Sequence, residues 1–107
     1  VLDDIGMPRE VALRHASTHF LHIFSGDGYA AGYYSYIWSE VLDADGFAAF
    51  KEAGDPFDPA TAERLYTYVY SAGGSRDYGE AYRLFRGRDP EIGGLLEGRG
   101  FVETTEA

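Results

Sequence analysis

The 107-residue sequence has no cysteine, which excludes disulfide bonds and thiolate metal sites from this chain. It also has no apolar run near the roughly 20 residues that a membrane-spanning helix needs. Basic residues are few, since 9 lysines and arginines stand against 18 aspartates and glutamates, for a formal net charge of -9. Nucleic acids and anionic membranes attract basic residues, so we expect neither as a partner. The missing cysteines and the acidic N-terminus (Asp3, Asp4) favour a cytoplasmic protein.

Hydrophobic residues make up 45% of the sequence, a share typical of globular proteins and too high for a disordered chain. The length allows one domain with its own core, but not two. No segment sustains the alternation of apolar and polar residues that predicts a strand. We therefore expect an all-α fold, a bundle of about four helices with a glycine-rich loop before the longest helix.

Aspartate followed by proline is typical of a helix start, because the carboxylate caps free N–H groups and proline suits the first turn. Asp58-Pro59 and Asp89-Pro90 fit this pattern, and Gly54 and Gly87 fit helix ends. The expected helices cover about residues 29–53, 59–72, 77–85 and 90–97, after a short helical stretch over 8–18. The apolar face of the longest helix is expected to consist of Tyr29, Tyr33, Tyr36, Ile37, Val41 and Phe47. In the next helix, one apolar stripe is expected from Ala62, Leu65, Tyr66 and Val69. The last two helices are expected to bury Tyr78, Ala81, Leu84, Phe85, Ile92, Leu95 and Leu96.

One stretch, residues 22–38, combines a histidine, a glycine-broken turn and a cluster of tyrosines. The spacings of Tyr29, Tyr33 and Tyr36 place their hydroxyls on one face if the segment is helical. A phenol donates a hydrogen bond while neutral near pH 7, because its ordinary pKa is about 10. Such a row of donors suits the binding of a polar, short-lived chemical species.

The same stretch resembles a run near the C-terminus of the thimet oligopeptidase, oligopeptidase A and peptidyl-dipeptidase family of zinc metallopeptidases. The likeness covers roughly residues 15–101 in family order. Its further segments are residues 39–47, 73–77, 85–90 and 95–100. The resemblance implies that residues 1–107 are the C-terminal helical segment of a larger peptidase catalytic domain that hydrolyses short peptides.

The resemblance also implies roles for single residues. Two tyrosines stabilise the tetrahedral intermediate of peptide hydrolysis, a histidine assists them, and a glycine-rich loop closes on the substrate. The implied catalytic residues are Tyr29, Tyr36 and His22, and the implied substrate-binding residues are Gly26, Gly28 and Tyr33. The chain departs from the family at Asp27, which splits the usual glycine pair and adds a residue between His22 and Tyr29.

Members of that family bind zinc through His-Glu-x-x-His and a later glutamate, and this chain has no His-Glu pair. His15 and His19 have the right spacing, but alanine follows His15 where the catalytic glutamate belongs. The resemblance therefore implies zinc in the full-length enzyme with its ligands outside this chain, and no metal on this chain alone. These residues should then be inactive by themselves, with a short peptide and the remainder of the peptidase as their partners.

Two other functions fit the residues. On a continuous helix, His15, His19 and His22 would align as a metal-binding module. The acidic surface would also suit a non-catalytic helical interaction module. Arg86 and Arg88 fit either a substrate carboxylate or ion pairs with the acidic helices, and we expect the ion pairs.

Overall fold

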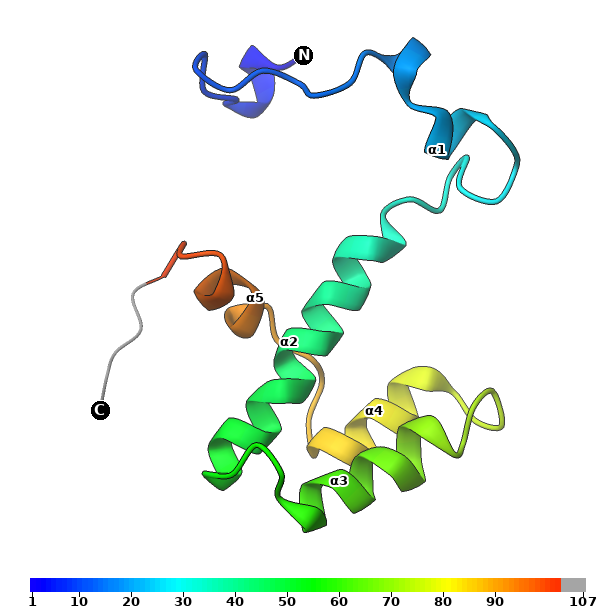
Figure 1. Cartoon of the computed structure of the whole chain (residues 1–107), viewed down its shortest axis with the longest axis vertical. Helices are drawn as coiled ribbons and strands as arrows, with labels where there is room; N and C mark the ends of the chain where they lie inside the picture. The colour runs from blue at the N-terminus through cyan, green and yellow to red at the C-terminus, as the bar shows by residue number, and fades with distance from the viewer. Residues whose placement is uncertain (103–107) are drawn as a thin grey trace. The chain divides into compact units, whose positions relative to one another are not determined.

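The computed structural model describes residues 1–102, and these contain helices, turns and irregular segments but no strand. The chain divides into two compact units, residues 1–34 and the residues from Ser35 onward. The α-helices of the described residues are α1 (Leu21–Phe24), α2 (Ser35–Ala53), α3 (Pro59–Leu65), α4 (Tyr78–Arg86) and α5 (Gly93–Gly98) (Figure 1). Short 3₁₀-helices cover Asp3–Ile5 and Ser17–His19, and a π-helix, Tyr66–Tyr70, continues α3. The expected all-α fold is confirmed.

The first unit contains only short helical turns. The helix expected over residues 8–18 is wrong, because the backbone there is irregular up to Ser17–His19. Val11 and Leu13 are both exposed, so no packing stabilises a helix at that place. An isolated segment of this length is too short to be a stable helix in water without such packing.

The longest helix, α2, begins at Ser35 and not at Tyr29. Residues 29–34 form turns, since Gly28 and Gly32 lower the helix propensity of this segment. The expected single helical face of Tyr29, Tyr33 and Tyr36 is therefore wrong. The other end of α2 is as expected: the helix stops at Ala53, and Gly54 takes a left-handed conformation with φ of 77°.

Carboxylate caps begin the two middle helices. Asp58 accepts a hydrogen bond of 2.7 Å from the backbone N–H of Thr61, which confirms the expected start of α3. Asp77 caps α4 in the same way. The cap expected at Asp89 is wrong, because α5 begins at Gly93 and has no side-chain cap. The Asp89 carboxylate instead accepts a hydrogen bond of 2.9 Å from Arg83.

The core of the second unit lies where α3 and α4 pack beside α2, and α5 packs along α2 (Figure 1). Gly94 makes the close approach of α5 possible, because an added Cβ would lie 3.1 Å from the carbonyl oxygen of Ala44. The buried apolar residues are Val41, Ala49, Ala81, Phe85 and Leu95. Many of the other residues expected on the apolar faces of helices are exposed, namely Tyr29, Tyr36, Ile37, Phe47, Ala62, Tyr66, Tyr78, Leu84 and Ile92.

A buried acid, Asp45 of α2, connects this helix to α4. Asp45 accepts hydrogen bonds from the Tyr82 hydroxyl at 2.6 Å, from Arg86 Nε at 3.2 Å and from Arg88 Nη2 at 2.7 Å. The two Nη atoms of Arg86 donate to both carboxylate oxygens of Glu52 at 2.8 Å. The side chains of Asp45 and Arg86 are only 3% and 4% exposed, so their charges depend on each other for compensation.

Replacing Asp45 with alanine should strongly weaken the attachment of α2 to α4. The substitution removes the buried partner of Arg86 Nε, Arg88 and the Tyr82 hydroxyl, and breaking a buried ion pair in comparable sites costs about 3 kcal/mol or more. Native-state hydrogen exchange of α2 and α4 amides, in the full-length protein, measures this loss as a lower free energy of opening. Glu63→Ala, on the exposed side of α3, is the control and should change the free energy of opening by about 0.5 kcal/mol or less. Equal effects of the two variants would contradict the role given to Asp45.

Candidate functional site

Three of the residues assigned from the sequence lie together in the first unit. The ring of His22 meets the ring of Tyr29 edge to face, with centroids 4.5 Å apart. The His22 and Tyr33 rings are 5.3 Å apart, and the Tyr29 and Tyr33 rings are 6.3 Å apart, again in edge contact. We call His22, Tyr29 and Tyr33 the ring cluster. It places an imidazole and two phenols, all able to donate hydrogen bonds, within one small region.

Short turns of backbone produce the ring cluster. The helix α1 carries His22 and ends where the N–H of Ser25 donates to the carbonyl of Leu21 at 2.7 Å. The chain then folds back, and the N–H of Gly32 donates to the carbonyl of Tyr29 at 3.3 Å. An added Cβ at Gly32 would lie 3.3 Å from the carbonyl oxygen of Gly28, so this turn favours glycine. The extra residue Asp27 does not keep His22 and Tyr29 apart.

The loop that carries Gly26 and Gly28 has open space beside its backbone. A Cβ added at either position would meet no atom within 4 Å, and neither glycine has a positive φ. Local strain therefore does not explain these two glycines. Bare backbone beside open space can offer N–H and C=O groups to an extended peptide.

Tyr36 belongs to the second unit, as the second residue of α2. Its side chain is 48% exposed and is therefore not locked inside the core. Because it lies in the first turn, it is close to the helix end at which free N–H groups carry partial positive charge. A side chain at this end of a helix is well placed to interact with an anion.

The described residues do not fit a zinc site. Residues 1–102 contain no group of three or more histidine, aspartate or glutamate side chains placed to hold a metal ion. The alternative built on His15, His19 and His22 is wrong, because the continuous helix that it needs is interrupted at Phe20. His15 stacks instead on the Phe20 ring, with centroids 5.1 Å apart. Among the same residues, no helix combines the length and apolar character that a bilayer crossing requires.

Comparison with known families matches residues 3–101 to "Peptidase family M3". The chain belongs to this family. It is 40% identical over 102 residues to oligopeptidase A of Haemophilus influenzae, which covers 95% of this chain and 15% of that protein. It is 46% identical over 81 residues to oligopeptidase A of Escherichia coli, which covers 76% of this chain and 12% of the relative. The dipeptidyl carboxypeptidase of Escherichia coli is 38% identical over 100 residues, and the match covers 94% of this chain and 14% of the relative.

The resemblance found in the sequence is thereby confirmed at the level of the family. The relatives are named as peptidases, and the M3 chain spans between 12% and 15% of their length. Most of a full-length relative therefore has no counterpart among these 107 residues.

Arg86 and Arg88 form ion pairs within this M3 segment, as expected. Arg86 pairs with Asp45 and Glu52, and Arg88 pairs with Asp45 and Glu91. Burial alone would raise the pKa of Asp45, but the hydrogen bonds that it accepts outweigh burial and hold the pKa below 3.8. The hydrogen bond from Arg86 likewise lowers the pKa of Glu52. Sequence reasoning missed Asp45, since an acid on a helix is normally a solvent-exposed residue.

These pKa shifts make the contact between α2 and α4 sensitive to acid. A carboxyl group with a lower pKa in the folded state stabilises the fold above its unfolded pKa. It loses that contribution as the pH falls through the folded pKa. The ordinary pKa values are 3.8 for aspartate and 4.5 for glutamate, so the loss begins below these values for Asp45 and Glu52.

We expect the free energy of opening of α2 and α4 to be steady above about pH 5 and to fall below pH 4. Hydrogen exchange between pH 5 and pH 3, corrected for the intrinsic exchange rate, measures this change. Asp45→Asn is the informative variant, because an amide has the shape of the protonated acid and no charge to lose. The difference between the wild type and this variant should shrink as the pH falls, and a constant difference would contradict the assignment.

Proposed function

We propose that this chain is the C-terminal helical segment of a larger M3 peptidase domain, in an enzyme that hydrolyses short peptides. The observation that carries the proposal is the family match over residues 3–101. The relatives named oligopeptidase A and dipeptidyl carboxypeptidase support a peptide substrate. Zinc would be bound by residues outside this chain, because the His-Glu-x-x-His motif of the resembled family does not occur in it. The segment by itself would then be inactive.

Within that enzyme, Tyr29 and Tyr36 would stabilise the tetrahedral intermediate of peptide hydrolysis. Negative charge develops on the carbonyl oxygen in this step, and one well-placed donor there lowers the barrier by about 3 to 4 kcal/mol. Tyr29 is supported by its contact with His22, and Tyr36 by its place in the first turn of α2. His22 would hydrogen-bond the substrate or the intermediate from the same ring cluster.

The loop around Gly26 and Gly28 would bind and close over the peptide. The open space beside both glycines supports this role, since a substrate backbone needs room to approach. Tyr33 would form part of the pocket wall, because it packs edge-on against His22. A short peptide and the rest of the peptidase are the proposed partners, without nucleic acid or membrane. The cytoplasmic location stays a prediction.

The tyrosine roles can be tested by kinetics of the full-length enzyme on a short peptide. Tyr36→Phe and Tyr29→Phe should each lower kcat by roughly 10²-fold and leave KM nearly unchanged, because each removes a donor used in the transition state. Tyr34→Phe is the matched control, since Tyr34 belongs to the same run, is exposed and has no assigned role. We expect the control to keep wild-type kinetics.

Two results would count against these assignments. An unchanged kcat would remove the substituted tyrosine from the mechanism. A rise in KM alone would instead place that tyrosine in ground-state substrate binding.

A further inference from the structure

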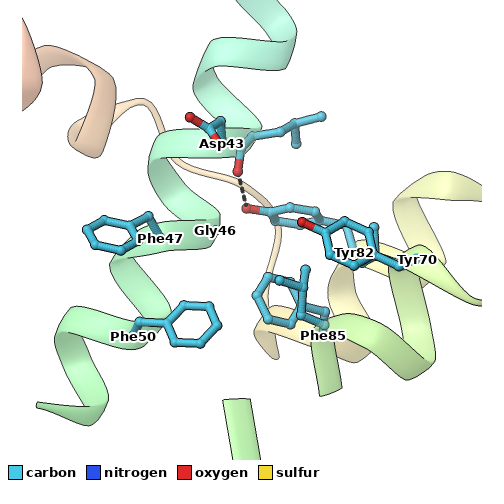
Figure 2. Close-up of a pocket in the computed structure, with 10 residues that line it drawn as sticks. Asp43, Gly46, Phe47, Phe50, Tyr70, Tyr82 and Phe85 are labelled. Carbon is cyan, nitrogen blue, oxygen red and sulfur yellow. Dashed lines mark hydrogen bonds between the residues drawn. The ribbon is translucent and has the colours of Figure 1, made fainter. Parts of the chain in front are cut away.

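An apolar groove opens on the surface of the second unit, between α2 on one side and the π-helix and α4 on the other. Figure 2 shows its lining, with Phe47 and Phe50 from α2, Tyr70 from the π-helix and Phe85 from α4. Leu42 and Val69 complete the apolar walls around a hollow of about 330 Å³. Asp43 is the only charged residue in the lining. We call this surface the α2 groove.

The residues of α2 indicate that another protein element packs on this surface. The apolar side chains of this helix do not form a single stripe, and charged residues such as Glu40 and Asp43 stand among them. Val41 and Ala49 face the core, whereas Trp38 and Phe47 are each more than half exposed. Large aromatic side chains exposed on one surface mark a place where another protein element packs. The helices packed on α2 within this chain cover only part of it.

The exposed rings at the groove support the same conclusion. Phe47 is 51% exposed and Tyr70 is 71% exposed, although both line the hollow. Large apolar side chains that gather on one exposed surface mark an interaction site.

We propose that the α2 groove is the docking surface for the remainder of the same peptidase chain, which would place an apolar element in it. This inference rests on the proposed function and adds the place of contact. The relatives supply the occupant, because this chain spans only 12–15% of their length and the rest must pack against it somewhere. The single charged residue in the lining matches the apolar character of permanent interfaces.

Other occupants fit the α2 groove less well. A peptide substrate needs polar partners for its backbone, but the Tyr82 hydroxyl at the groove already donates to Asp45. That hydroxyl also lies 3.3 Å from the carbonyl oxygen of Leu42 (Figure 2). A second copy of this chain carries the same net charge of -9, which opposes association.

Thiol labelling of the full-length enzyme tests the proposal, because this stretch of chain has no cysteine of its own. Single variants Phe47→Cys and Tyr70→Cys report on the α2 groove, and Glu63→Cys, exposed on α3, is the matched control. Peptide mass spectrometry measures the labelling rate of each thiol in the native enzyme against the rate in urea. We expect the groove thiols to react about 100-fold more slowly in the native enzyme, and the control less than tenfold more slowly.

Peptidase activity of each variant shows that it has folded and tests the proposed function separately. Fast labelling of both groove thiols in an active enzyme would overturn the docking proposal and leave the proposed function intact. Slow labelling that becomes fast on dilution would also overturn it, in favour of a second copy. Absence of peptidase activity in the wild type would reject the proposed function, whatever the labelling shows.

Wild-type oxidative footprinting gives the same comparison without a substitution. The rings of Phe47 and Tyr70 should be protected from hydroxyl radicals in the native enzyme if the groove is covered. Oxidation of both rings at the rates found in urea would overturn the proposal.

Discussion

The buried carboxylate of Asp45 is the constraint on which the second unit depends. It takes hydrogen bonds from Tyr82, Arg86 and Arg88, so it ties α2 to α4 and to the turn that follows α4. Arg86 also reaches Glu52, two helical turns further along α2, and therefore fixes α4 at two points on the same helix. Apolar contacts such as those of Val41 and Phe85 are not directional, whereas these hydrogen-bonded charges join particular positions of the two helices.

Fixing α2 matters because this one helix carries two features of functional interest. Tyr36 stands at its start, and the α2 groove lies along its second half. A 19-residue helix is about 28 Å long and rigid. Contacts that hold its second half in place therefore also limit where its first residues can lie. The catalytic role proposed for Tyr36 would gain precision from such an element, because a helix holds a side chain more firmly than a loop does. The ring cluster, by contrast, depends on short turns, with open space beside Gly26 and Gly28.

Sequence reasoning succeeded where a few neighbouring residues determine the structure. The Asp58-Pro59 start of α3 and the glycine at the end of α2 follow from local hydrogen bonding and backbone freedom. It failed at the start of α2, where turns built around Gly32 replaced the helix expected from tyrosine spacing. It also missed Asp45, because the only signal was a pair of arginines some 40 residues away in sequence. The ring cluster was found through family likeness, and its geometry came from turns that no periodicity describes.

The exposed apolar residues of α2 and the α2 groove have the same physical cause. An apolar stripe predicts burial only when another element covers it, and the helices packed on α2 within this chain cover only part of it. The second unit places the charges of Asp45 and Arg86 inside and leaves Phe47 and Trp38 outside, the reverse of an ordinary small domain. That inversion is reasonable where a further protein layer covers the outer rings. The internal ion pairs then hold α2 in place for whatever packs against it, and the apolar surface supplies the energy of packing.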